Sequence, residues 1–297
     1  MDALLKALSF ALGHLPRAFV TALGPALGAL IFRLDRKRRG VAVDNLKRAF
    51  GNSISGAETE RIVKKVFSNL IVMFFEFMRL PWLDEKRLDA LVEFEGLSHF
   101  DEALKKGRGV IMCTAHYGNW ELLAFSLGLK GYPLDLVVRE VDNPVFEGFV
   151  SWVRTRSGNR IIYKQKAMRR LLTRLKENAI VTILLDQNVT HREGFFVDFF
   201  GSPACTNKGP ALLALGSGAP IVPVFIRRTP GGHRVEVFKE IEYGQTGERE
   251  RDAEEVTRRC TAFIEERIRV HPEEWFWVHR RWKTRPEPGK GLETARG

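Results

Sequence analysis

His116 and Glu121 stand five positions apart and offer the clearest chemistry in the sequence. His116 follows the apolar run VIMCTA at 110–115, and Glu121 follows Tyr-Gly-Asn-Trp. A carboxylate bonded to one imidazole nitrogen fixes the tautomer and leaves the other nitrogen as a proton acceptor. Such a pair is a general base that can deprotonate a hydroxyl. No Ser or Cys stands beside it as an obvious nucleophile, so we expect the hydroxyl to belong to the substrate.

This pairing requires a junction between a strand and a helix. In one straight helix the two side chains would point about 140° apart and could not meet. Gly118 permits a tight turn between them, and Asn119 suits the N-cap of a helix. Glu121 then lies in the first helical turn, where the helix dipole favours a carboxylate, and is expected to reach back to His116. The alternative is a structural or incidental histidine at a strand end, because a lone His-x4-Glu spacing is a weak signal.

The elements that must position these residues follow a regular alternation from about residue 91 onward. Short apolar runs typical of strands occupy 91–96, 109–115, 134–139, 160–163, 179–185, 220–226 and 234–238. Helical patterns occupy 98–107, 119–130, 143–156, 165–177, 206–216 and 249–270. The alternation predicts an α/β fold with a mostly parallel central sheet flanked by helices on both faces. Strands that are apolar throughout favour a sheet buried on both sides.

A second polar cluster, Asp186-Gln187-Asn188, follows the predicted strand at 179–185. Ligands of open α/β sheets bind beyond the carboxyl ends of strands. Both this cluster and His116 lie at such ends. A turn after a buried strand is the alternative interpretation of the second cluster.

The N-terminal segment 1–34 has the features of a membrane-associated helical region. Its residues 18–32 carry no charge, but this run is shorter than the roughly 20 apolar residues of a membrane span and contains Pro25. The cationic block at 36–39 that follows resists translocation and favours the cytoplasmic side. We therefore expect an interfacial or marginally inserted anchor, with a buried helical hairpin as the alternative.

The remainder of the chain reads as one domain. We expect a single α/β domain over 35–286 and a flexible tail over 287–297, which is rich in Gly and charge. Residues 57–80 form a long helical pattern ended by Pro81. The second half of this helix is apolar nearly all round, which suits a buried helix or one that touches lipid.

Charge and cysteine content limit the classes of partner and cofactor. The net charge is +11, and residues 148–176 carry nine Lys or Arg and no acid. Residues 33–48 carry seven basic residues against two acids. Such blocks attract anionic lipid, nucleic acid or an acidic protein, unless they are only solvated basic faces. The three cysteines are far apart without CxxC spacing, which argues against disulfides and a zinc site and fits a reducing compartment.

The order of several motifs closely resembles that of the lipid A late acyltransferases, the lauroyl and myristoyl transferases of the lysophospholipid acyltransferase superfamily. The motifs are HYGNWELLA at 116–124, VVREVDNP at 137–144, LLDQN at 184–188, FFGSPACTNKGPALLALGSGAPIVPV at 199–224, and EEWFWVHRRWKTRP at 273–286. The resemblance covers most of the chain. It is specific for the family and much less specific for the substrate.

The resemblance implies a mechanism and a set of site residues. His116 and Glu121 match the family's His-x4-acid motif, so His116 would deprotonate an acceptor hydroxyl while Glu121 orients and charge-balances it. Arg139 would contact substrate phosphate or the developing oxyanion, or is otherwise a surface arginine at a strand end. Substrate contacts are also expected from the remaining candidates: Asp186, Gln187, Asn119 and, more weakly, Lys208. The tryptophans of the last motif are expected to serve packing.

The resemblance also implies substrates and partners. The donor would be an acyl thioester of acyl carrier protein, and the acceptor an anionic lipid A precursor at the cytoplasmic face of the bacterial inner membrane. No metal or bound cofactor is expected.

Three competing functions remain open on the sequence. An acyltransferase with the same chemistry would act on a lysophospholipid, an ornithine lipid or a phosphatidylinositol mannoside. A basic nucleic-acid-binding protein would use the charge, but no helix-turn-helix, zinc-finger or RNA-binding signature is present, so no nucleic acid partner is expected. A catalytically inactive membrane scaffold would leave the intact pair of His116 and Glu121 unexplained.

Overall fold

Seven strands form one central sheet in the order β1-β9-β8-β2-β5-β3-β4. The computed structural model describes residues 2–165 and 167–287. Neighbouring strands are parallel except β8 and β9, which are antiparallel. The strands of this sheet are β1 (Val92–Glu95), β2 (Val110–Thr114), β3 (Leu134–Val138), β4 (Arg160–Tyr163), β5 (Ile180–Leu184), β8 (Ile221–Arg228) and β9 (His233–Val237). The predicted mostly parallel α/β sheet is confirmed.

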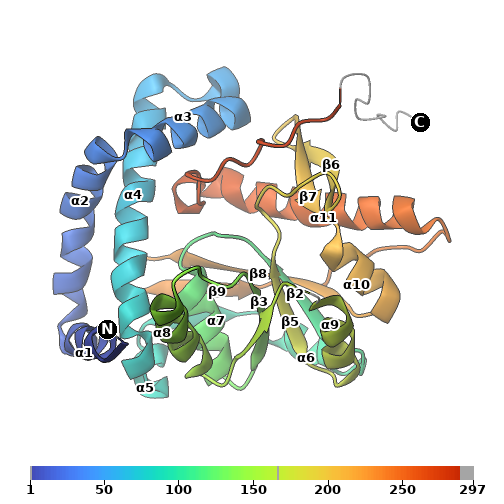
Figure 1. Cartoon of the computed structure of the whole chain (residues 1–297), viewed down its shortest axis with the longest axis horizontal. Coiled ribbons are helices and arrows are strands. Elements are labelled where there is room, and N and C mark those ends of the chain that lie inside the picture. Colours follow the sequence, from blue (N-terminus) through green and yellow to red (C-terminus); the bar gives the residue numbers. More distant parts are fainter. Residues whose placement is uncertain (1, 166, 288–297) are drawn as a thin grey trace.

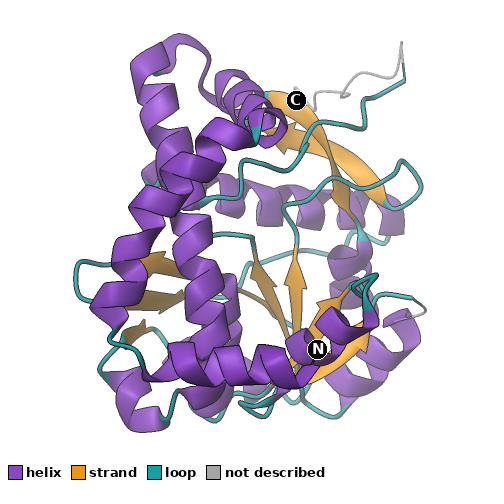
Figure 2. Cartoon of the chain, turned by 60° about the vertical axis from the view of Figure 1, so that its left-hand side comes forward, coloured by secondary structure: helices purple, strands orange, loops and turns teal. Residues whose placement is uncertain are grey.

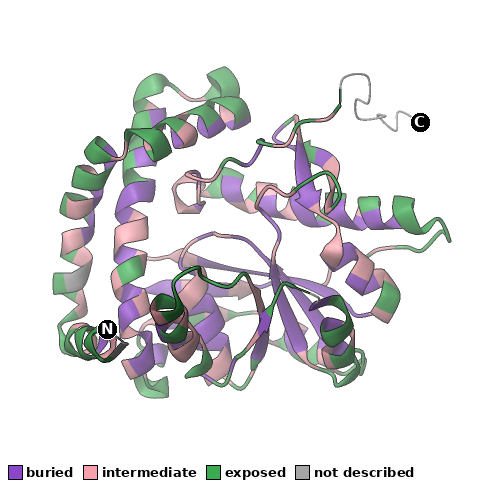
Figure 3. Cartoon of the chain, viewed as in Figure 1, coloured by how far each residue is buried: buried purple, intermediate pink, exposed green. Residues whose placement is uncertain are grey.

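Helices cover both faces of the sheet (Figure 1). Alternate residues of β2 belong to different cores, because successive side chains of a strand point to opposite faces. Ile111 and Cys113 pack with α9 (Ala167–Lys176), α10 (Gly209–Ser217) and α11 (Arg249–Val270). Val110 and Met112 pack with α6 (Ser98–Leu104), α7 (Trp120–Leu129) and α8 (Pro144–Thr155). The central strands β2, β5 and β8 are buried along nearly their whole length, as their continuous apolar character predicted (Figure 3).

The N-terminal part of the chain is helical and lies against one side of the sheet domain. Its helices are α1 (Asp2–His14), α2 (Arg17–Leu34), α3 (Arg36–Phe50), α4 (Gly56–Arg79) and α5 (Glu85–Asp89), with short 3-10 turns η1 (Gly51–Ser53) and η2 (Leu80–Trp82). Figure 2 shows α2 and α4 running side by side. The long helix predicted over 57–80 is confirmed as α4, and it links the N-terminal helices to the sheet.

Two glycines allow α2 to approach α4 closely. A Cβ atom built on Gly28 would lie 2.6 Å from the Cα of Ser68, and one built on Gly24 would lie 2.2 Å from a methyl of Val72. Small residues four apart on a helix permit this kind of close backbone approach. The glycine pair therefore fixes where α2 lies on α4.

The outer face of α1 and α2 is apolar and exposed. Its exposed large apolar residues are Leu4, Leu8, Phe10, Leu15, Phe19, Leu30, Ile31 and Leu34. Within the described residues, α2 is the one helix long and apolar enough to cross a membrane, judged by length and composition. Its mean hydropathy is 1.4 and only 18% of it is buried. One face of α2 packs on α4, and the rest of the helix faces outward. The membrane-associated segment stays a prediction.

A two-stranded antiparallel hairpin, β6 (Gly194–Phe199) and β7 (Ser202–Asn207), was not predicted from the sequence. Its turn residues Phe200 and Gly201 both have positive φ, at 56° and 70°. A two-residue turn with positive φ at both positions suits the twist of a hairpin. The hairpin lies against α11 and above the carboxyl ends of the central strands (Figure 1).

The domain boundaries drawn at residues 34 and 286 stay predictions. The predicted flexible tail at 287–297 lies outside the described residues, apart from Glu287.

Candidate active site

A cavity of about 460 Å³ opens at the carboxyl ends of three neighbouring strands of the sheet. Its polar lining includes His116, Glu121, Arg154 and Gln187. Its apolar lining comes from the strands and from α7: Met112, Leu123, Ala124, Leu136, Val137, Val138, Ile183 and Leu184. Met112 precedes His116 by four residues, which in an extended strand is about 13 Å. The cavity therefore combines a polar group of residues with a long apolar wall.

His116 lies where the strand-to-helix junction was predicted. β2 ends at Thr114, Gly118 adopts a positive φ of 60°, and α7 begins at Trp120. The side chain of Asn119 caps α7 by accepting a hydrogen bond from the backbone N–H of Leu122 at 3.0 Å. The turn, the cap and the helix start expected from the sequence are thus present.

The carboxylate that contacts His116 is Asp186, not Glu121. The imidazole Nδ1 lies 2.8 Å from Asp186 Oδ1, and the backbone N–H of His116 donates to Oδ2 at 3.0 Å. Both residues extend neighbouring strands in register, because Thr114 of β2 pairs with Leu184 of β5. With Nδ1 as donor to Asp186, the other ring nitrogen, Nε2, is free to accept a proton.

Asp186 is buried, with 2% of its surface exposed, yet its surroundings favour the charged form. Burial alone would raise the pKa of Asp186. The charge of His116 and the hydrogen bonds from His116 and Trp275 more than offset burial, so the pKa of Asp186 lies below its ordinary value. The carboxylate of Asp186 is used within the protein, and Asp186 is not among the residues that line the cavity. The substrate-binding role expected for Asp186 stays a prediction.

Glu121 forms a bidentate ion pair with Arg154 of α8. Its two carboxylate oxygens accept hydrogen bonds from Arg154 at 2.6 and 3.0 Å. The expectation that Glu121 reaches back to His116 is wrong, because Arg154 takes both of its oxygens. Burial works against the charge of Arg154, but Glu121 more than offsets it and raises the pKa of Arg154. The sequence reasoning missed Arg154, whose only signal was its place in the basic run at 148–176.

The C-terminal segment, residues 274–284, is hydrogen-bonded to the loop that follows β2 and to the loop that follows β5. The N–H of Gly118 donates to the carbonyl of Glu274 at 2.9 Å, and the N–H of Phe276 donates to the carbonyl of His116 at 3.0 Å. Between them, the indole N–H of Trp275 donates to Asp186 Oδ2 at 2.7 Å. Trp275 was expected to serve packing alone; its indole also holds the carboxylate that holds His116.

The same segment continues along the loop after β5. The backbone N–H of Asn188 donates to the ring of His279 at 3.0 Å, and its side chain exchanges hydrogen bonds with Thr284. The fully buried Arg281 donates to the carbonyl of Cys205 at 2.8 Å and to Thr206. The last motif of the sequence thereby joins the site loops to the β6–β7 hairpin.

The remaining candidates divide into those that line the cavity and those that do not. Gln187 lines it, with its side-chain nitrogen 3.3 Å from His116 Nε2. Arg139 also lines it and is 85% exposed, with Asp142 at 3.8 Å. Lys208 is not among the lining residues; its ammonium lies over the ring of Phe195.

Asn119 is fully buried and is not among the residues that line the cavity. Its oxygen caps α7 and its nitrogen donates to Glu76 at 2.8 Å. The structure gives Asn119 these two contacts, and the substrate-binding role expected for it stays a prediction. Among the described residues, no group of three or more His, Cys, Asp or Glu side chains is arranged to hold a metal ion.

Comparison with known proteins matches residues 1–284 to the model of the bacterial lipid A biosynthesis acyltransferase family. A lipid A biosynthesis lauroyltransferase from Escherichia coli is 28% identical over 275 residues, which cover 92% of this chain and 88% of that protein. A lipid A biosynthesis myristoyltransferase from the same organism is 24% identical, with 89% and 80% covered. A phosphatidylinositol mannoside acyltransferase from Mycobacterium tuberculosis is 25% identical over 214 residues, with 70% and 66% covered.

Proposed function

The chain belongs to the bacterial lipid A biosynthesis acyltransferase family, and on that premise we propose that it transfers a fatty acyl chain from an acyl carrier protein thioester to a hydroxyl of a lipid A precursor. The observation that carries the proposal is the hydrogen bond between His116 and Asp186 beside a cavity with an apolar wall. This arrangement supplies a base for a hydroxyl and room for a hydrocarbon chain.

The reaction follows from the two nitrogens of His116. Nδ1 donates to Asp186, and Nε2 accepts the proton of the acceptor hydroxyl as its oxygen attacks the thioester carbonyl. The tetrahedral intermediate collapses with cleavage of the carbon–sulfur bond. The leaving thiolate takes the proton from the imidazolium, which yields an ester and the free thiol of the carrier. Asp186 stabilises the imidazolium throughout, and the scheme requires no metal or cofactor.

Gln187 occupies the position that the hydroxyl must take. Its amide lies 3.3 Å from Nε2, which is long for a hydrogen bond and lets a hydroxyl replace it. The pair of Glu121 and Arg154 faces the same cavity, where it orients the reacting groups around the thioester. The two charges of this ion pair are fixed in place before the substrate arrives. Preorganised charges of this kind stabilise the charge that develops during the reaction.

The apolar wall of the cavity suits the acyl chain, and the mouth suits an anionic acceptor. The chain would run from His116 toward Met112, between the strands and α7. Arg139 and Lys164 line the cavity with exposed positive charge for a phosphate. Lys208 stays a weaker candidate for that role, because it lies outside the cavity lining.

The proposed site of action is the cytoplasmic face of the bacterial inner membrane. The exposed apolar side chains of α1 and α2 suit the hydrocarbon region, and the cationic block at 36–39 suits anionic head groups. The excess of basic residues also suits acyl carrier protein, which is acidic. The lipid A names of two of the relatives support this acceptor class.

The proposal is tested in cells and in vitro with one variant. A strain that lacks the protein is expected to produce lipid A without one secondary acyl chain, measured by mass spectrometry, and the wild-type gene restores it. His116→Ala is expected to lower turnover by about 10²–10⁴ with acyl carrier protein as donor. Near-normal turnover of a folded His116→Ala protein would overturn the assigned base.

A second acceptor class has one observation in its favour, the relative that acts on a phosphatidylinositol mannoside. The catalytic groups described above act on any lipid hydroxyl. The same mass spectrometry distinguishes the two: unchanged lipid A with altered phospholipids or glycolipids would assign this second class.

A further inference from the structure

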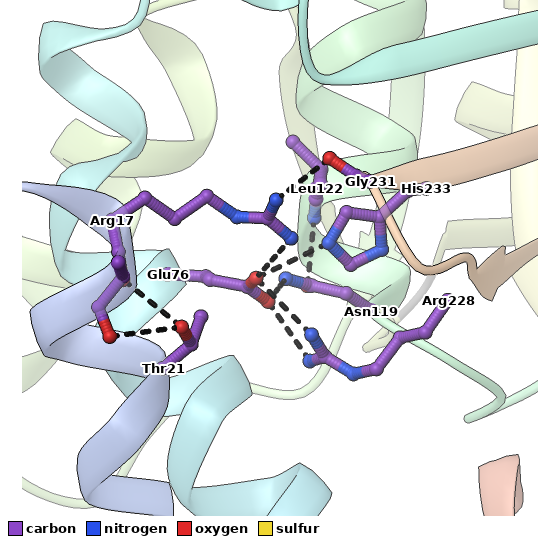
Figure 4. A network of polar contacts seen from close by, with 9 residues as sticks. Arg17, Thr21, Glu76, Asn119, Leu122, Arg228, Gly231 and His233 are labelled. Carbon is purple, nitrogen blue, oxygen red and sulfur yellow. Dashed lines mark hydrogen bonds and ion pairs between the residues drawn. The ribbon is translucent and has the colours of Figure 1, made fainter.

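A buried glutamate at the centre of the molecule joins the N-terminal helices, the sheet and the helix that carries Glu121. Glu76 lies in the otherwise apolar second half of α4 and is only 5% exposed. Figure 4 shows its carboxylate surrounded by side chains from four other segments of the chain. A buried carboxylate is costly unless it is paired and hydrogen-bonded, so its position requires a reason.

The contacts of Glu76 satisfy both carboxylate oxygens. Arg228, at the end of β8, donates to both oxygens at 2.8 and 3.1 Å, and the ring Nε2 of His233 in β9 lies at 3.1 Å. Arg17, the first residue of α2, lies 3.7 Å away and donates to the carbonyl of Gly231. The fourth partner is Asn119, which donates at 2.8 Å.

The contact with Asn119 leads directly to the cavity. Asn119 uses its nitrogen for Glu76 and its oxygen for the N–H of Leu122, so Glu76 fixes the rotation of the side chain that caps α7 (Figure 4). The next two residues, Trp120 and Glu121, both line the cavity. The ring of Trp120 also packs edge-on against His116, with the ring centres 5.0 Å apart.

We propose that Glu76 is a positioning residue for acyl transfer, which acts through Asn119 to hold the first turn of α7, and with it Trp120 and Glu121, in register with His116. The inference rests on the proposed function and deepens it. Its three other contacts fix Glu76 itself: Arg228 and His233 place it relative to the sheet, and Arg17 places it relative to α2. The carboxylate of Glu76 therefore contacts both the first residue of α2, Arg17, and the residue that caps α7, Asn119.

The test separates the contact with Asn119 from the general contribution of Glu76 to stability. Glu76→Gln replaces one carboxylate oxygen with an NH2 group, which cannot accept the hydrogen bonds that this oxygen now accepts. Asn119→Asp places a second negative charge beside the carboxylate of Glu76. Each is expected to lower kcat about tenfold or more with KM within about threefold, because a 1 Å misplacement can cost about 10²-fold in rate. The double variant exchanges the two groups, so that the amide introduced in α4 donates to the carboxylate introduced before α7, which still caps that helix. It is expected to restore kcat to within about threefold of wild type.

Two further variants keep the test decisive. His233→Gln removes the imidazole but keeps an N–H donor for the carboxylate, so Glu76 stays in place. This variant is expected to lower Tm while kcat stays within about threefold of wild type. If Glu76→Gln does not fold, Asn119→Ser replaces it: serine keeps the helix cap but is too short to reach Glu76, and kcat must still fall about tenfold.

The outcomes that overturn the inference differ from those that overturn the proposed function. Wild-type kcat in Glu76→Gln or in Asn119→Ser would remove the positioning role. So would a double variant no faster than its slower parent, or an equal loss of kcat in His233→Gln. A wild-type protein without turnover on any acyl carrier protein donor would instead overturn the proposed function, whatever the variants do.

Discussion

The imidazole of His116 contacts the carboxylate of Asp186, a residue 70 positions later in the chain. The two acids near the cavity therefore have different partners. Asp186 holds Nδ1 of His116 and is itself held by Trp275. Glu121 holds Arg154 and faces the cavity. His116 and the carboxylate that it contacts therefore come from two neighbouring strand ends, not from one motif.

Replacement of Asp186 and replacement of Glu121 are expected to have different effects on the His116 ring. Asp186→Asn leaves one acceptor oxygen for three donors. Two of these donors converge on Oδ2, so the new NH2 group is expected to face Nδ1 and favour the wrong tautomer, and kcat is expected to fall by about 10²–10⁴. Glu121→Gln is also expected to impair turnover, since it weakens the hold on Arg154, but it does not touch the imidazole. Nitrogen-15 NMR of His116 is therefore expected to change in Asp186→Asn alone. Identical ring spectra in both variants would contradict the assignment of Asp186 as the orienting group.

Trp275→Phe tests the indole hydrogen bond with little change in packing. Phenylalanine keeps a ring against Phe199 and Trp277 but cannot donate to Asp186. We expect a fall in kcat of about tenfold, smaller than that of Asp186→Asn, because the carboxylate keeps both hydrogen bonds from His116, one from Nδ1 and one from the backbone N–H. The matched control is Trp282→Phe: this indole N–H is buried without a partner among the described residues, so its loss is expected to leave kcat within about threefold. A similar loss of kcat in both variants would show that ring volume, not the hydrogen bond, matters.

Residue spacing predicted the members of the site better than their contacts. The strand end at His116, the turn at Gly118 and the cap at Asn119 follow from local chemistry, and all are present. The contact between His116 and Asp186 depends on β2 and β5 being neighbours in the sheet, which no local pattern in one sequence specifies. The sequence did place both residues at strand ends, and that was the available signal.

Most elements of the sheet domain could be predicted, because apolar strands and amphipathic helices alternate with clear turn residues. The β6–β7 hairpin could not, because Phe200 occupies a positive φ where Asn or Gly would signal the turn. Its ring is instead held by tertiary contacts with Phe50 and Trp277. Packing against distant parts of the chain overrides the local preference at this position.

The close approach of α2 and α4 predicts opposite effects for two glycine replacements. Gly28→Ala places a methyl group 2.6 Å from the Cα of Ser68, so α2 must move away from α4. Gly40 in α3 has nothing within 4 Å of the position of a Cβ atom. Alanine there raises helix propensity and is expected to stabilise by about 0.5–1 kcal/mol.

Thermal unfolding and hydrogen exchange measure both effects. Gly28→Ala is expected to lower Tm and to speed exchange in α2, whereas Gly40→Ala is expected to raise Tm slightly. A Tm for Gly28→Ala at or above that of Gly40→Ala would show that α2 and α4 are not held by this contact.

Across the whole molecule, buried titratable groups predict a stability that falls as pH falls. Burial lowers the pKa of His233 and of His279 below the ordinary 6.5, so the unfolded chain binds protons there that the folded chain does not. Stability is therefore expected to decline as pH drops below about 6.5. The pKa values of Glu76 and Asp186 also lie below their ordinary values of 4.5 and 3.8, so their contribution is lost as pH falls further. Glu274, whose pKa is raised by burial, acts in the opposite direction.

A series of Tm measurements between pH 8 and pH 3 checks this expectation. We expect a plateau above about pH 7, a first decline below about 6.5, and a steeper one below about 4.5. His233→Gln is expected to flatten the first decline, because it removes one of the two imidazoles whose pKa is lowered by burial. A Tm that stays constant from pH 7 to pH 5 would contradict the burial of neutral histidines.

The hydrogen bonds from residues 274–276 to the loop after β2 and to Asp186 have a consequence for how the protein is made. A ribosome produces His116 and Asp186 well before Trp275, so both side chains emerge earlier than the segment that holds them. A chain that stops between Asp186 and Glu274 would carry both side chains without these hydrogen bonds. We therefore expect the arrangement around His116 to form only after Phe276 has been added to the chain.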